Sequence, residues 1–169
     1  MLNSLSGRFL ILTTVFVMLA EVLIFVPSVA RYREDYLVDR LERAQIASLA
    51  LLADDMIDPD LERELLANAG VYNVALQRNA TRELMLSSPV PGPVSKTYDL
   101  REAGPVVLMR DAILRLVDPA PRLIRVLGYP SREAGQLIEV TMDSAPLRYA
   151  MLEYGLRISI TCCDFSPNL

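Results

Sequence analysis

The chain has 169 residues, is 52% hydrophobic and carries a formal net charge of −4. This length suits one membrane anchor and one domain of about 130 residues, which can bury a core without disulfide bonds. The absence of histidine excludes Ser-His-Asp and Cys-His nucleophile systems, and the absence of a basic patch argues against nucleic acid as a partner.

Residues 9–30 form an almost wholly apolar run, which as a helix is roughly 33 Å long and covers a bilayer core of about 30 Å. Glu21 is the one carboxylate in it. A charge near mid-span costs about 2.5–3.5 kcal/mol, whereas the Leu, Ile, Val and Phe residues of the run return a total of roughly 4–8 kcal/mol, so insertion is favoured. A cleaved signal peptide, starting at Arg8 and ending at Ala30, and a buried soluble helix are the alternatives.

Glu21 is the individual residue that the sequence singles out for function, because an acid inside a membrane is costly and usually has a role. The alternative is that Glu21 is protonated, or hydrogen-bonded to its twin in a dimer, and serves only helix pairing.

Residues 31–54 continue in a helical pattern with no helix breaker between Val29 and Tyr36, so the anchor and this segment are expected to form one rod. Small and apolar residues recur along it at spacings of three and four. We expect this stripe to form part of a parallel homodimer interface. Its members are Leu37, Leu41, Ala44, Ser48 and Leu51.

A short helix is predicted over residues 58–70, with Asp58 as N-cap, Pro59 at the first position and Gly70 at the left-handed C-terminal position. Four carboxylates near its start are weak candidates for a divalent metal site: Asp54, Asp55, Asp58 and Asp60. The spacing lacks the glycine of a calcium loop, and capping explains Asp58 and Asp60 without a metal. No other metal site and no cofactor site is predicted.

The remaining chain alternates between strand and helix patterns. Strands are predicted over 71–78, 81–86, 94–100, 123–127 and 136–142, and helices over 105–117 and from Asp143 or Ser144 through Leu156. This order predicts an α+β domain with a small mixed, mostly antiparallel sheet flanked by long helices. We interpret it as PAS-like.

Five arginines populate the third helix and the late hairpin, and arginine forks match carboxylates and phosphates. They are Arg110, Arg115, Arg122, Arg125 and Arg132. These side chains either converge on an anionic ligand or form a solvated face, since Asp111, Asp118 and Glu133 lie nearby in the sequence.

Several segments together resemble the amino-terminal region of bacterial membrane-bound sensor histidine kinases. They are residues 20–30 (AEVLIFVPSVA), 44–51 (AQIASLAL), 134–140 (AGQLIEV), 146–148 (PLR) and 154–158 (YGLRI). The resemblance implies a first span, an extracytoplasmic sensor domain and a last helix that leads into a second span. In that family a HAMP-type linker, a phosphoacceptor helix and an ATP-binding domain follow, and the signal passes through the membrane as helix movement within a homodimer.

After Ile158 the sequence matches none of those later parts, so the resemblance supports a sensor half that is itself non-catalytic. We divide the chain into a cytoplasmic stub and transmembrane helix (1–30), an extracytoplasmic sensor domain (31–158) and an aberrant or disordered tail (159–169). A shifted reading frame near residues 157–159 would explain that tail. The downstream DNA is then expected to encode, in another frame, an apolar span and later a histidine-bearing helix.

The expected location is the inner membrane, with one span and the domain in the periplasm. The arginines that follow the span favour the opposite orientation by the positive-inside rule; they are Arg31, Arg33, Arg40 and Arg43. The expected partners are a second copy, membrane lipid and an unknown extracytoplasmic signal or protein. The alternative function is a membrane-anchored envelope interaction or scaffold protein, complete as it stands.

Overall fold

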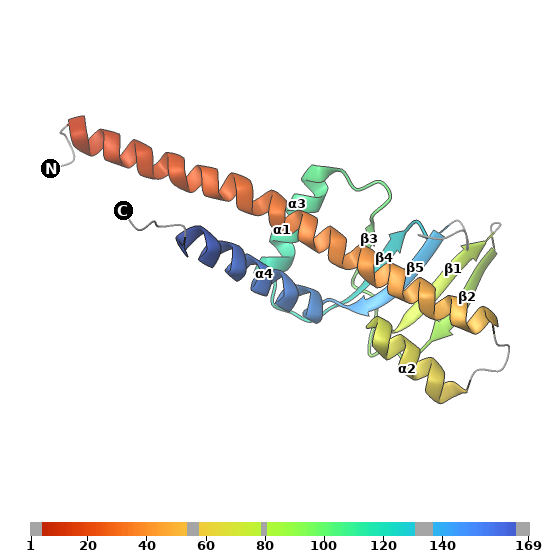
Figure 1. Ribbon diagram of the computed structural model, residues 1–169. Helices are drawn as coiled ribbons and strands as arrows, with labels where there is room; N and C mark the ends of the chain where they lie inside the picture. Colours follow the sequence, from red (N-terminus) through yellow and green to blue (C-terminus); the bar gives the residue numbers. More distant parts are fainter. Residues whose placement is uncertain (1–4, 54–57, 79–80, 131–136, 165–169) are drawn as a thin grey trace.

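The computed structural model describes residues 5–53, 58–78, 81–130 and 137–164 (Figure 1). The elements in chain order are α1 (Leu5–Ala53), α2 (Pro59–Ala69), β1 (Asn73–Arg78), β2 (Thr81–Ser87), β3 (Lys96–Asp99), α3 (Pro105–Val117), β4 (Leu123–Gly128), β5 (Leu137–Asp143) and α4 (Ala145–Asp164). The predicted strands are confirmed, with ends that differ by one or two residues.

The five strands form a single sheet in the order β2-β1-β5-β4-β3. The pairs β1–β2, β1–β5 and β4–β5 are antiparallel, whereas β3 and β4 are parallel and are joined by the α3 crossover. The predicted α+β fold with a mixed, mostly antiparallel sheet is therefore confirmed.

Helix α1 is continuous over 49 residues and passes through Pro27, so the predicted anchor and the following segment form one rod (Figure 1). Three hydroxyl groups of its apolar part donate to the carbonyl four residues earlier: Thr13 to Phe9, Thr14 to Leu10 and Ser28 to Ile24, at 2.8–2.9 Å. These bonds satisfy polar groups within the helix, as a bilayer requires. Within the described residues, α1 is the one helix with the length and composition of a membrane span.

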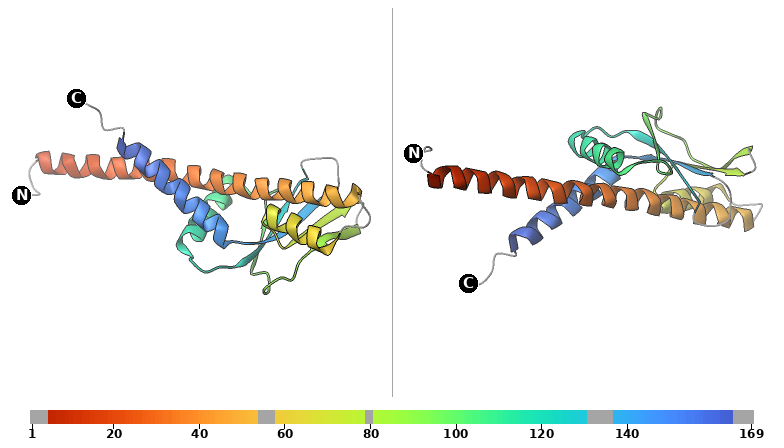
Figure 2. Two further views of the ribbon diagram at one scale, coloured as in Figure 1. Left: turned by 60° about the horizontal axis from the view of Figure 1, so that its bottom comes forward. Right: turned by 90° about the horizontal axis from the view of Figure 1, so that it is seen from above.

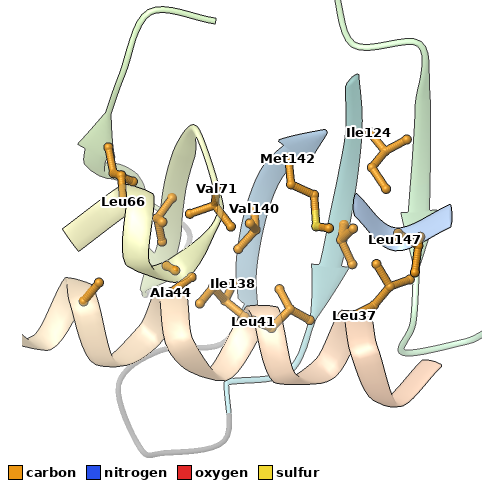
Figure 3. Close-up of a cluster of buried hydrophobic side chains, with 14 of the residues drawn as sticks. Leu37, Leu41, Ala44, Leu66, Val71, Ile124, Ile138, Val140, Met142 and Leu147 are labelled. Atoms are coloured by element: carbon orange, nitrogen blue, oxygen red, sulfur yellow. The ribbon is translucent and has the colours of Figure 1, made fainter. Parts of the chain in front are cut away.

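The carboxyl-terminal half of α1 crosses one face of the sheet and supplies the centre of the core (Figure 3). Strands β4 and β5 alternate, so that Ile124 and Val126 of β4 are buried toward the helix while Arg125 on the same strand is only half-buried on the other face. Ile138, Val140 and Met142 of β5 complete this buried layer.

The burial of the α1 stripe corrects its interpretation as a dimer interface. The side chains of Leu37, Leu41, Ala44 and Ser48 are buried inside their own chain, and Figure 3 shows the first three facing the sheet. Side chains that are already buried in the core cannot also contact a second copy. The side chain of Leu51 lies outside the described residues.

Helix α2 has the ends that the sequence predicts. The Asp58 carboxylate accepts from the Asp60 amide at 3.1 Å, and Gly70 has φ 67° at the C-cap. The Arg40 side chain of α1 donates to the Ala69 carbonyl at 2.9 Å and lies where a Cβ on Gly70 would be. A glycine at residue 70 therefore serves both the backbone turn and the docking of α2 on α1.

Helix α4 crosses α1 at an angle, and the start of α1 and the end of α4 both lie on the same side of the sheet (Figures 1 and 2). The Tyr32 and Tyr154 rings stack with centroids 4.2 Å apart, and a Cβ on Gly155 would meet the Phe25 ring at 3.2 Å. Close packing thus joins the two terminal helices.

The expected tail boundary at residue 158 is not the end of α4. The helix continues to Asp164, so the first six residues of the segment interpreted as aberrant or disordered are helical. The physical reason is local: residues 159–164 contain neither Gly nor Pro, and the next helix breaker is Pro167. Residues 165–169 lie outside the described residues.

Candidate functional site

Three charged side chains are buried between α1, α3 and the edge of the sheet: Arg33, Asp111 and Arg115. Buried charges are costly and normally have partners, so an unsatisfied one is informative. Arg33 is only 1% exposed, and its Nε and Nη2 atoms have no hydrogen-bond partner within the described part of the chain.

Arg33 lies on α1 four residues before Leu37, on the same side of the helix as the buried stripe, so its side chain points inward. Its guanidinium lies over the Tyr98 ring of β3, with Cζ 4.3 Å from the ring centroid. Burial lowers the pKa of Arg33, while Tyr98 and Asp111 oppose that shift. Tyr98 and the negative charge of Asp111 therefore stabilise the buried cation of Arg33.

Asp111 on α3 is a buried carboxylate whose charge stabilises the Arg33 cation, but its hydrogen bonds go to other residues. Its Oδ1 atom accepts from Lys96 Nζ at 3.0 Å and from Arg110 Nη2 at 3.3 Å. Burial acts to raise the pKa of Asp111, but the hydrogen bond and charge of Lys96, with Arg110 and Arg33, outweigh it and hold the pKa below its ordinary value. Asp111 is thus an ionised carboxylate that Lys96 and Arg110 both bind.

Arg115, also on α3, resembles Arg33 in having a buried guanidinium with only part of its hydrogen bonds made. Its Nη1 donates to the Ala120 carbonyl at 3.0 Å, whereas Nε and Nη2 have no hydrogen-bond partner among the described residues. Burial lowers the pKa of Arg115, and the charge of Asp118 opposes this.

Two small cavities adjoin these guanidinium groups. The first, of about 300 Å³, is lined by Arg33, Arg110 and Asp111 together with Lys96 and Tyr98. We call it the Arg33 cavity. The second, of about 250 Å³, is lined by Arg115, Arg122 and Asp118, and it shares Lys96 and Tyr98 with the first. Strand β3 therefore separates two spaces, each with a buried arginine in its wall.

A larger cavity of about 640 Å³ lies where α1, α3 and α4 meet. Its lining includes Pro27, Tyr32, Glu34, Met109 and Tyr154. Pro27, Ser28 and Ala30, at the predicted outer end of the span, are part of this lining.

The structure brings two of the five predicted arginines together, since Arg115 and Arg122 line the same small cavity, whereas Arg110 lines the Arg33 cavity. Arg125 lies elsewhere, on the opposite face of the sheet, where its Nε is 2.8 Å from Glu139 Oε1. Arg132 lies outside the described residues.

Two of the four candidate metal-binding aspartates, Asp58 and Asp60, lie in the described part of the chain. Asp58 caps α2, as the capping alternative predicted, and Asp60 pairs with Arg63. Asp54 and Asp55 lie outside the described residues. Within those residues, no group of three or more potential metal ligands occurs.

Glu21 has an exposed side chain on α1, within the predicted span. Its position is compatible with either role considered for it, so it stays a candidate.

Sequence reasoning missed Arg33, Lys96 and Tyr98. One signal was present: extending the stripe from Leu37 back by four residues places Arg33 on the buried side. The strand carrying Lys96 and Tyr98 is four residues long, and nothing local indicates that it pairs beside α3.

Comparison with known proteins gave no match to this chain among protein-family models, curated proteins or solved structures.

Proposed function

We propose that this chain is the membrane-anchored, signal-sensing region of a two-component sensor histidine kinase, with its domain in the periplasm. It has no phosphoacceptor histidine, so it is proposed to act on a kinase half and not by its own catalysis. The observation that carries the proposal is the packing of α4 against α1 beside the predicted span (Figure 2).

That packing supplies a mechanical connection. Gly155 of α4 approaches Phe25, which lies inside the predicted span, so the end of α4 reaches the level of the bilayer. A change in the domain that shifts α4 relative to α1 would then act on two helices at the membrane. Packed helices move as rigid elements, which is how such a shift can be transmitted.

The fold weakens the argument that the arginines after the span make against the proposed orientation. Arg33 is buried, Arg40 caps α2, and Arg43 pairs with Asp39 at 2.9 Å. Residues committed to a folded domain are poor indicators of topology, because domains translocate largely regardless of charge.

The PAS-like identity is also part of this proposal. Its support is a sheet whose first and last strands, β1 and β5, pair at the centre, with the helix α1 across one face. We further propose a homodimer that uses the outward side of α1, where Val38, Glu42 and Ile46 are exposed, in place of the buried stripe.

A chimeric kinase tests this function. Residues 1–158 are joined to the second span, HAMP linker and catalytic half of a bacterial sensor kinase, and autophosphorylation is measured in membranes. Gly155→Leu drives a side chain into the Phe25 ring and should change autophosphorylation several-fold. Leu156→Ala, on an exposed neighbouring position, is the matched control and should leave it near the parent value.

The proposal is contradicted if both variants and a chimera lacking residues 31–158 show the same autophosphorylation. That result would favour the anchored scaffold, in which the domain holds a partner and sends nothing through the membrane.

A further inference from the structure

The Arg33 cavity combines an unsatisfied guanidinium with additional cations, and we propose that it binds a small oxyanion, a carboxylate or a phosphate, through Nε and Nη2 of Arg33. The proposal concerns binding. That the anion is the sensed signal rests additionally on the proposed function.

The two unpartnered atoms are the pair that an oxyanion requires. Nε–H and one Nη2–H project from the same edge of a guanidinium, and this edge makes two parallel hydrogen bonds to a carboxylate or phosphate. Both nitrogens of Arg33 are buried without a hydrogen-bond partner in the described residues. The Tyr98 ring lies against the guanidinium, with Cζ 4.3 Å from the ring centroid, so packing restricts the movement of this edge.

The carboxylates in the wall of the cavity do not fill this role. Asp111 accepts from Lys96 and Arg110, and Asp99 is bonded to Arg101 at 2.6 and 2.9 Å. Glu102 is exposed. The buried cation of Arg33 is therefore the charge that an incoming anion would neutralise.

Lys96 and Arg110 provide the entrance. Their side chains are 43% and 65% exposed, whereas Asp111 between them is buried. All three cations line the same cavity, so an anion bound at Arg33 also lies in the field of Lys96 and Arg110. A cavity of about 300 Å³ is at the small end of the range for ligand sites, which favours a compact anion.

The oxyanion has two possible sources. Arg33 follows the predicted span by three residues, so a lipid headgroup phosphate is within the same region as a soluble metabolite. Both present the same oxygen pair to the guanidinium edge, and the experiment distinguishes them.

The test uses the full chain in nanodiscs of phosphatidylcholine. Inorganic phosphate and acetate are titrated by isothermal calorimetry up to about 10 mM, which detects millimolar affinity. Saturable binding of one of them is expected. Arg33→Lys should weaken it at least about tenfold, because an ammonium group cannot make the bidentate contact. Arg43→Lys, on the same helix but paired with Asp39 at the surface, should leave the affinity unchanged.

A second arm adds phosphatidylglycerol to the nanodiscs. If the headgroup is the source, the thermal midpoint of the domain should rise with this lipid in the parent chain and in Arg43→Lys but not in Arg33→Lys. The proposal is overturned if neither soluble anion nor anionic lipid has an effect, or if Arg33→Lys and Arg43→Lys respond alike. Since binding is measured and not kinase output, its failure leaves the chimera test unaffected.

Discussion

Leu37→Ala is expected to lower the free energy of unfolding of the domain by about 2–5 kcal/mol. Leu37 is 0% exposed and packs between α1 and the sheet, so truncation removes buried apolar atoms and leaves a cavity that the two rigid layers cannot fill. Urea denaturation in detergent micelles, followed by far-UV circular dichroism, measures the loss.

Leu61→Ala is the matched control, because it is the same substitution at a residue of α2 that is 46% exposed. Its cost is expected to stay below about 1 kcal/mol. The effect of Leu37→Ala should also be independent of protein concentration. A loss that disappears as the chain is concentrated would instead restore the dimer-interface interpretation of the stripe.

Asp111→Asn is the second change with a large expected effect, a loss of about 3 kcal/mol of unfolding free energy at neutral pH. The substitution removes the buried carboxylate that binds Lys96 and Arg110, and it leaves the Arg33 cation without a nearby opposite charge. Arg33→Met in the Asp111→Asn background should recover part of the loss, because the uncompensated cation is then absent. Chemical denaturation of the parent chain, the two single variants and the double variant gives the coupling free energy between Asp111 and Arg33.

The pH dependence of the Asp111 effect has a definite sign. The pKa of Asp111 is lower in the folded state than its ordinary value of about 3.9, so its stabilisation is fully present above that pH. It is lost as the pH falls through the folded-state pKa. The stability difference between the parent chain and Asp111→Asn should therefore be constant from neutral pH to mildly acidic pH and should shrink below about pH 4. A difference that is unchanged at strongly acidic pH would contradict this role.

Much of the secondary structure followed from local signals. Asp58-Pro59 and Gly70 fix the ends of α2 by capping chemistry, and Gly104-Pro105 starts α3 where the sequence predicts. Strand ends shifted by one or two residues, because pairing with neighbours decides them. The end of α4 was misplaced because a change from apolar to polar composition was taken as an end, although it contains no helix breaker.

Tertiary relationships were less accessible from the sequence. A stripe such as Leu37 and Leu41 shows that one side of a helix is covered. The same spacing suits packing against a sheet of the same chain and packing against a helix of a second chain. The site was also inaccessible from the sequence, because Arg33 and Asp111 are far apart along the chain. Only the fold places Tyr98 under the guanidinium of Arg33.

A cysteine placed in the domain tests directly whether the domain lies outside the cytoplasm on a membrane anchor. Pro91 is exposed in the segment between β2 and β3, so Pro91→Cys, with Cys162 and Cys163 changed to Ser, reports the side on which the domain lies. Spheroplasts that produce the full chain are treated with a membrane-impermeant maleimide before and after lysis, with Asn3→Cys as the control on the other side of the span. We predict labelling of residue 91 in intact spheroplasts and of residue 3 only after lysis; the reverse pattern would contradict an extracytoplasmic domain.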